Sequence, residues 1–127
     1  MASKEAIKTA SAPEAIGPYS QAIKSGSLVF LSGQIPLIPK TMEIVEGDIA
    51  AQTHQVFKNL KEVTSAAGGD LGDIVKLTIF MTKLKNFEIV NEIMKQYFQE
   101  PFPARATIEV SALPKAVSIE IEAIMAL

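Results

Sequence analysis

The chain has 127 residues, of which 48% are hydrophobic and 20% charged, with a net charge of −2 and no cysteine. This is enough apolar material for the core of one domain, which excludes a disordered tail or a fibrous repeat. The sequence also lacks the basic runs that bind nucleic acid, cysteine pairs for disulfides or metals, and any apolar stretch that could span a bilayer. We expect a single cytoplasmic domain over residues 1–127. Its mean hydropathy of +0.24 is consistent with surface buried against other subunits.

Extended structure is predicted in the N-terminal third of the chain. Two prolines limit regular structure in residues 1–18, where a short extended segment is expected near Ile7. Residues 19–26 and 28–34 then read as two strands of a hairpin, joined by a Ser-Gly-Ser turn. Residues 35–39 contain two prolines, so they cannot continue in a central ladder.

A helix and a strand are predicted next. Between residues 48 and 67 the apolar positions repeat with a helical period, Asp48 is a candidate N-cap, and two glycines supply a stop. Residues 73–82 predict a strand. Period two places four apolar side chains on one of its faces: Val75, Leu77, Ile79 and Met81. Because the other face is also partly apolar, this strand suits a sheet with helices on one side and another subunit on the other.

The C-terminal part predicts a second helix and two more strands. Asn86 can cap a helix that runs to about Phe98, after which two prolines end it. Residues 104–110 and 117–125 read as strands, and the short segment between them makes a hairpin the simplest connection. The order of elements is strand-strand-helix-strand-helix-strand-strand, which predicts one compact α+β domain.

Arg105 points most directly to a ligand. It is the only arginine, and lysine supplies the other eleven of the twelve basic residues. Period two groups Arg105 with Thr107 and Glu109, and we assign the alternate, apolar face of the strand to the core. A planar guanidinium binds a carboxylate or phosphate through two parallel hydrogen bonds, which an ammonium group cannot do. The alternative is a structural ion pair with Glu109, Glu120 or Glu122.

Glu120 is the second candidate for chemistry. Glu120 and Glu122 share one face of an otherwise apolar strand. Partial burial raises the pKa of a carboxyl group toward the range of a general base. An exposed sheet face is the alternative. We prefer that alternative for Glu122, whereas the pattern leaves both open for Glu120.

Other positions carry weaker signals. Tyr19 could offer its hydroxyl to a ligand or serve as a half-buried packing residue. The backbone can approach a ligand closely at Ser32 and Gly33. The only histidine, His54, is expected on the solvated face of its helix. Without a second histidine or a cysteine, it predicts neither a ribonuclease-type acid–base pair nor a zinc site.

Four short blocks occur in order along the chain: Ile16-Gly17-Pro18-Tyr19-Ser20, Ser32-Gly33-Gln34-Ile35-Pro36, Phe102-Pro103-Ala104-Arg105, and Leu113-Pro114 followed by Ile119-Glu120-Ile121-Glu122-Ala123. Together they resemble the Rid family of enamine/imine deaminases, the RidA or YjgF group. The resemblance implies a chorismate-mutase-like α+β fold, with a mixed sheet of about six strands and two helices packed on one face. It also implies a homotrimer with active sites between subunits. In the sheet that it implies, the last two strands of the chain are not neighbours.

The resemblance further implies an activity that needs no cofactor. Rid proteins of this type hydrolyse 2-iminobutanoate and 2-iminopropanoate, and the products are 2-oxo acids and ammonia. By position, Arg105 would grip the substrate carboxylate, and Glu120 would orient or activate the attacking water. The two residues would meet across the cleft between neighbouring subunits.

The remaining site residues also follow from the resemblance. Tyr19, contributed by the neighbouring chain, and Ser32 would shape the pocket. The backbone at Gly33 and Thr107 would contact the imino nitrogen, and Asn91 would line the site. Thr107 departs from the several relatives that carry cysteine there. If only the main chain acts at this position, deamination should survive the change.

Two other functions are alternatives to the enzyme. One is a trimeric binding, chaperone-like or translation-inhibiting protein, because such roles are also attached to the family. The other is chorismate mutase activity, which follows from fold analogy alone and would require more than one guanidinium for a dicarboxylate. The predicted partners are therefore a small 2-imino acid and further copies of the chain, with no nucleic acid, membrane or metal.

Overall fold

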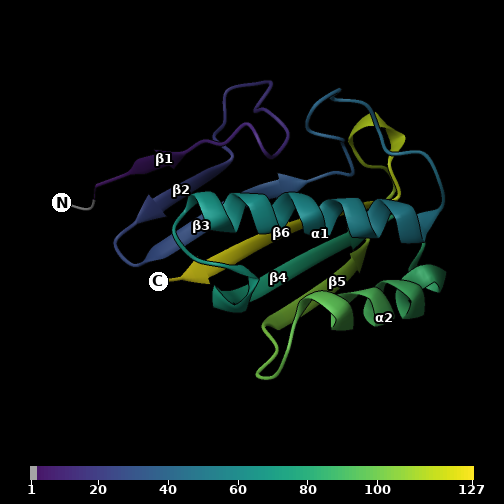
Figure 1. Cartoon of the computed structure of the whole chain (residues 1–127). Coiled ribbons are helices and arrows are strands. Elements are labelled where there is room, and N and C mark those ends of the chain that lie inside the picture. Colours follow the sequence, from purple (N-terminus) through teal and green to yellow (C-terminus); the bar gives the residue numbers. More distant parts are fainter. Residues whose placement is uncertain (1–2) are drawn as a thin grey trace.

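A computed structural model describes residues 3–127, which form one six-stranded sheet with two helices packed against it (Figure 1). The strands are β1 (Glu5–Ile7), β2 (Ala22–Ser25), β3 (Leu28–Gln34), β4 (Ile74–Met81), β5 (Ala104–Glu109) and β6 (Ile119–Ala126). The helices are α1 (Ile49–Ala66) and α2 (Phe87–Tyr97), with short 3-10 turns at Leu71–Asp73, Leu84–Asn86 and Pro114–Ala116. The predicted α+β class is confirmed. The first two residues of the expected 1–127 domain lie outside the described residues.

The strand order in the sheet is β1-β2-β3-β6-β4-β5. β4 and β5 run parallel, with α2 as their crossover, and the other neighbouring pairs are antiparallel. β6 lies between β3 and β4, where it forms two antiparallel ladders that a terminal hairpin would not allow. The hairpin favoured by spacing is therefore wrong, and the separation of the last two strands implied by the Rid resemblance is confirmed.

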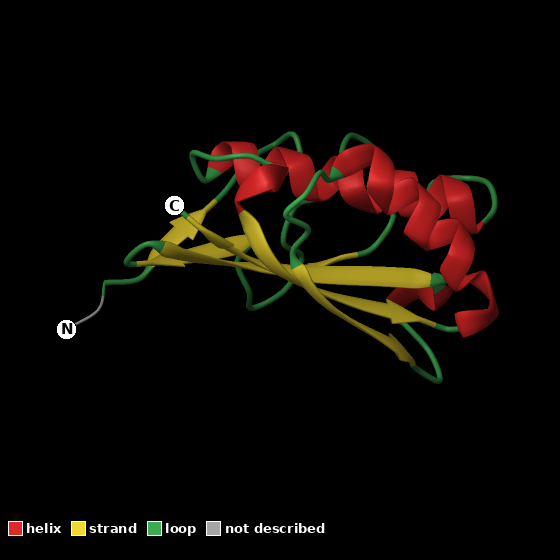
Figure 2. Ribbon diagram, turned by 90° about the horizontal axis from the view of Figure 1, so that it is seen from below, coloured by secondary structure: helices red, strands yellow, loops and turns green. Residues whose placement is uncertain are grey.

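Both helices lie on the same face of the sheet, and the other face is open in the single chain (Figure 2). The core forms between the helices and this covered face. Its largest fully buried side chains are Phe57, Leu60, Leu77, Ile79, Met81, Ile119, Ile121 and Met125. Several large apolar side chains stay exposed elsewhere on the strands: Leu28, Phe30, Val75 and Ile108. One face of the sheet is therefore buried under the helices, and the other face carries exposed apolar side chains.

Two strand predictions need correction. The register of β4 against β6 shifts between Ile74 and Lys76, so Ile74 turns into the core and Val75 is 48% exposed. The predicted alternation holds from Leu77 onward. β2 begins at Ala22 rather than at residue 19, because the backbone turns back at Tyr19, whose N–H donates to the Gly17 carbonyl at 2.8 Å.

The helix ends show how far local signals reach. Asp48 caps α1 as predicted, because its carboxylate accepts from the Ala51 N–H at 3.1 Å. Asn86 occupies the N-cap position of α2 without a side-chain cap, since α2 continues directly from the 3-10 turn Leu84–Asn86. No helix within residues 3–127 has the length and apolar character needed to cross a membrane.

Candidate active site

Arg105 lies on the helix-covered face of β5, which corrects the predicted assignment of faces. In the parallel ladder it is level with Leu77, whose side chain is buried under the helices. Its Nη1 donates to Asn91 Oδ1 of α2 at 2.8 Å, and its guanidinium carbon lies 5.0 Å from the centroid of the Phe87 ring. The alternate face, predicted as core, leaves Ile108 43% exposed. The alternation was right, but β5 turns its polar residues toward α2.

The guanidinium of Arg105 keeps donors free for a ligand. Its hydrogen bonds to Asn91 and to the Met94 sulfur, the latter at 3.5 Å, both use Nη1, which leaves the other nitrogens available. Among residues 3–127 no carboxylate pairs with it, so the predicted alternative of a structural ion pair is wrong. Glu109 instead accepts from the Leu84 N–H at 2.9 Å. The pocket beside Arg105 measures about 360 Å³ and is lined by Asn91, Met94, Lys95, Phe102 and Pro103.

Glu120 lies in a different pocket, of about 450 Å³, between the ends of β3 and β6. Tyr19, Ser32 and Gly33 line the same pocket. The register of β3 against β6 shifts between Leu31 and Gln34, both of which are buried, so the two residues between them bulge away from the core. A Cβ atom at Gly33 would collide with the Glu120 carboxylate. Glycine is therefore required for the close approach of this carboxylate to the bulge.

The environment of Glu120 suits a proton acceptor. Burial raises the pKa of its carboxyl group above the ordinary value, and the negative charge of Glu122 raises it further. Glu122 itself is exposed, as preferred from the sequence. A carboxylate with a raised pKa is a stronger base than an ordinary carboxylate, which suits general-base catalysis.

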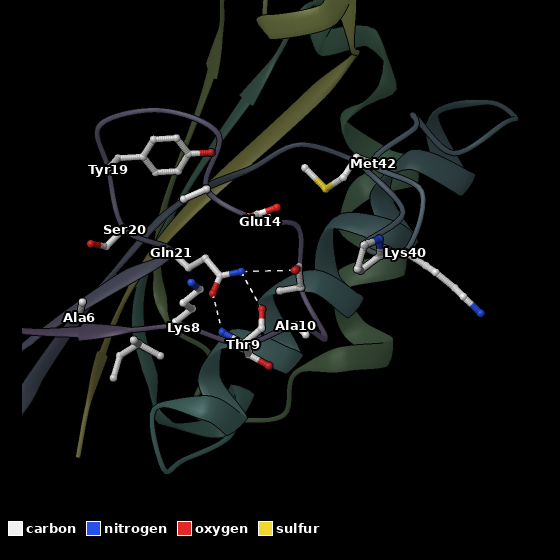
Figure 3. A pocket seen from close by; sticks show the side chains of 14 residues that line it. Ala6, Lys8, Thr9, Ala10, Glu14, Tyr19, Ser20, Gln21, Lys40 and Met42 are labelled. Atoms are coloured by element: carbon white, nitrogen blue, oxygen red, sulfur yellow. Dashed lines mark hydrogen bonds between the residues drawn. The ribbon is translucent and has the colours of Figure 1, made fainter.

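The loop that carries Tyr19 is held from two sides. The Ser32 hydroxyl donates to the Ser20 carbonyl at 2.5 Å, which ties this loop to the bulge in β3. Gln21, only 4% exposed, donates from Nε2 to the Pro13 carbonyl at 2.7 Å. It also accepts from the Thr9 N–H at 2.7 Å (Figure 3). Tyr19 and Gln21 also line an adjoining pocket of about 600 Å³. Gln21 was missed from the sequence, because only its burial reveals its role.

Thr107 and His54 both lie in partly buried surroundings. The Thr107 hydroxyl is buried and has no hydrogen-bond partner among the described residues. His54 is half-buried rather than solvated, because its Nδ1 lies 2.8 Å from the Tyr97 hydroxyl between the two helices. It belongs to neither pocket. Residues 3–127 contain no cluster of three His, Asp or Glu side chains that could hold a metal ion.

The predicted site residues therefore form two groups on one chain. Arg105 and Thr107 of β5 face Asn91 of α2, whereas Tyr19 lies with Ser32 and Gly33 of β3 and Glu120 of β6 around the other pocket. The strand β4 lies between β5 and β6, and it pairs Leu77 with Arg105 of β5 and Phe80 with Glu120 of β6. Positions three residues apart on a strand point to opposite faces, so one chain does not bring Arg105 and Glu120 together.

Comparisons with known proteins agree with this fold and these motifs. The family profile described as "Endoribonuclease L-PSP" matches residues 9–127. A RutC family protein of Pyrococcus horikoshii is 54% identical over 121 residues, which cover 95% of this chain and 96% of the relative. A 2-iminobutanoate/2-iminopropanoate deaminase of Dermatophagoides farinae is 46% identical over 125 residues, which cover 98% of each.

The comparison of structures gives the same result. The crystal structure of a Yersinia pestis protein of the conserved Rid family superposes with a TM-score of 0.96 at 50% identity, covering 98% of this chain and 100% of that chain. The six-stranded sheet and the two helices match those of this neighbour. The chain belongs to the Rid (YjgF) family, which the endoribonuclease L-PSP profile describes.

Proposed function

We propose that this protein hydrolyses small 2-imino acids, such as 2-iminobutanoate and 2-iminopropanoate, to 2-oxo acids and ammonia. Relatives that are 46% identical to this chain carry the name of that deaminase. The free donors of Arg105 match a substrate carboxylate. The half-buried carboxylate of Glu120 matches the need for a base.

The separation of Arg105 and Glu120 carries the proposal of a shared site. Each pocket holds one half of the required chemistry, so a complete site needs two copies of the chain. Exposed Tyr19 beside one pocket and exposed Phe102 beside the other supply apolar contact area for such an interface. We therefore propose a cytoplasmic homotrimer of a single Rid-type domain, residues 1–127, with each active site between neighbouring subunits.

The reaction is a hydrolysis that these residues can promote by position and proton transfer. Arg105 binds the substrate carboxylate and holds the electrophilic imine carbon in place. Glu120 takes a proton from water as the water oxygen bonds to that carbon, and it returns this proton to the imine nitrogen to give an amino alcohol. Glu120 then takes the proton of the new hydroxyl group and passes it to the nitrogen, the C–N bond breaks, and ammonia leaves as the carbonyl forms. No electrons are exchanged with any other compound.

The other residues support this arrangement. Asn91 orients the guanidinium of Arg105 through its Oδ1 atom. Tyr19 and Ser32 shape the pocket around Glu120. The main chain at Gly33 and at Thr107 contacts the imino nitrogen, in line with the family resemblance. This part of the proposal needs no side-chain chemistry at position 107.

Subunit mixing tests the proposal. Arg105→Ala and Glu120→Gln chains are each expected to keep only about a hundredth of wild-type activity or less alone, in an assay that generates the imine in situ and follows 2-oxo acid. Co-expressed with different tags at equal levels, they form mixed oligomers. If each site takes Arg105 from one subunit and Glu120 from its neighbour, roughly a quarter of the sites are intact. The mixture should then show roughly a quarter of wild-type activity.

The outcomes of this experiment are distinct. An inactive wild-type protein would refute the deaminase function. An active wild-type protein whose mixed variants show no more activity than either variant alone would refute the shared site. Each variant is first checked for wild-type oligomer size by size-exclusion chromatography, so that a failure of assembly is not taken for a loss of chemistry.

A further inference from the structure

The turn that leads into β6 has an unusual backbone. Lys115 has φ 56° and ψ 23°, and Ala116 has φ 57°, so two consecutive non-glycine residues adopt the left-handed conformation. This region is unfavourable for residues with a Cβ atom, and it persists only where the surrounding structure fixes it. Pro114 and Lys115 line the pocket that contains Glu120. The strained turn is therefore a wall of that pocket.

A side chain of α1 holds the end of this turn. The Ser118 N–H donates to Gln52 Oε1 at 2.9 Å, although the two residues are 66 positions apart in the sequence. The Ser118 carbonyl accepts from the Thr82 N–H at 3.2 Å, so both polar backbone groups of Ser118 are held. Ser118 lies two residues before Glu120. The bond from Gln52 thus fixes the chain between the strained turn and the carboxylate.

α1 is a rigid support for this contact. Val56, Phe57 and Leu60, within the next two turns after Gln52, have no exposed surface. Asn59, 1% exposed and two turns after Gln52, donates to the Leu37 carbonyl at 2.9 Å. Leu37 lines the same pocket from the side of β3. Neutral amide side chains of one helix therefore hold two of the segments that line the pocket.

We propose that Gln52 is a positioning residue for Glu120: its bond to Ser118 holds the left-handed Lys115–Ala116 turn and sets where the Glu120 carboxylate stands. The proposal rests on the deaminase function proposed above. Gln52 does not line the Glu120 pocket, and it acts through the backbone of β6. Its loss should impair the chemical step and leave carboxylate binding at Arg105 unchanged.

Matched substitutions at Gln52 separate positioning from general stability. Gln52→Leu removes the acceptor, whereas Gln52→Glu keeps an acceptor oxygen for the Ser118 N–H. We expect Gln52→Leu to lower kcat by roughly ten- to a hundredfold, the range typical of a misplaced catalytic group, with KM changed less than about threefold. Gln52→Glu should retain most of kcat. Gln96→Leu, the same change at an exposed position of α2, serves as the control.

A second substitution tests whether the effect passes through the turn. Ala116→Gly places at φ 57° a residue that adopts this conformation without strain, so the turn needs less support. The loss of kcat caused by Gln52→Leu should therefore be several-fold smaller in the Ala116→Gly background. Should Gln52→Leu not fold alone, the comparison is made between Ala116→Gly and the double variant.

The proposal and the underlying function fail in different ways. An inactive wild-type protein refutes the deaminase function. With an active wild type, an unchanged kcat in Gln52→Leu refutes the positioning role. So does an equal loss of kcat in Gln52→Leu and Gln52→Glu, or a loss that Ala116→Gly does not reduce. A lower thermal midpoint with kcat unchanged below that midpoint also refutes it, because it shows a purely structural role.

Discussion

The two pockets of this chain differ in where they lie in the sheet. Arg105 stands on the edge strand β5, where a single helix covers it and its guanidinium stays partly open to solvent. Glu120 stands on β6, a central strand, and is enclosed by the bulge in β3 and the loop that carries Tyr19. The exposed edge suits a cation that must admit and release a substrate. The enclosed position suits a carboxylate whose pKa depends on burial.

The largest effect is expected at Arg105. Arg105→Ala removes the guanidinium that we propose makes two parallel hydrogen bonds to the substrate carboxylate. The value of kcat/KM should fall roughly 150-fold, which corresponds to about 3 kcal/mol of transition-state stabilisation. Arg105→Lys keeps the charge without the planar fork and should fall by roughly tenfold or more. Lys95→Ala is the control, because Lys95 lines the same pocket but is paired with Glu92 at 2.9 Å. Equal losses at Arg105 and Lys95 would show that only the charge of the pocket matters.

Glu120 should control the rate and its acid limb. Glu120→Gln is expected to lower kcat by roughly a hundredfold with little change in KM, because it removes a proton acceptor and not the anchor. The base acts when ionised, so activity falls as pH drops through its pKa. Because burial and Glu122 raise that pKa, the acid limb should lie above the pH range of an ordinary carboxyl group.

Glu122→Gln tests whether the charge of Glu122 contributes to the raised pKa of Glu120. It removes the smaller cause of the raised pKa of Glu120, so the acid limb of kcat should move to lower pH while the plateau changes less than about twofold. The readout is the pH profile of kcat in the deaminase assay. A limb that moves to higher pH, or a plateau that falls as in Glu120→Gln, would contradict this assignment.

Local signals predicted much of the fold and the identity of the candidate residues. The helical period and the Asp48 cap predicted α1 because the partners of a cap lie within one turn. Period two correctly grouped Arg105 with Thr107 on one face of β5. It could not say which face a helix covers, because both faces of an edge strand carry small or polar residues, and the covering helix is set by the crossover from β4.

Features that depend on distant partners could not be predicted from local pattern. The bulge at Ser32 and Gly33 exists only through pairing with β6, nearly ninety residues later. The roles of Gln21 and Gln52 depend on partners 12 and 66 positions away. The separation of Arg105 from Glu120 likewise follows from strand order, which the spacing of the last two strands suggested wrongly.

Gly33→Ala tests the close contact between the bulge and the carboxylate. The added Cβ atom would collide with the Glu120 side chain, which must move, so kcat should fall by roughly tenfold. The same change in the Glu120→Gln background should cost much less, since its effect passes through the carboxylate. The measurement is a double-mutant cycle on kcat, and additive losses would show that Gly33 matters for another reason.

The smallest effect on activity is expected from Thr107→Val. The Thr107 hydroxyl is buried without a partner among the described residues, and valine has nearly the same shape without the unsatisfied group. The substitution should therefore stabilise the fold by about 1 kcal/mol, or raise Tm by roughly 4 °C. Activity should stay within about twofold, because the proposed site uses only the main chain at this position.

Thr53→Val is the matched control for this last substitution. The Thr53 hydroxyl is buried but donates to the Ile49 carbonyl at 2.7 Å, so its removal should bring no gain in Tm. If Thr107→Val instead leaves Tm unchanged and raises KM about tenfold, the hydroxyl binds substrate and the assignment of a main-chain role is wrong. In that case the Arg105 pocket would supply a second side chain to the carboxylate. The two strands would then differ more clearly in role: side chains of the edge strand β5 would bind the substrate, and Glu120 on the central strand β6 would transfer protons.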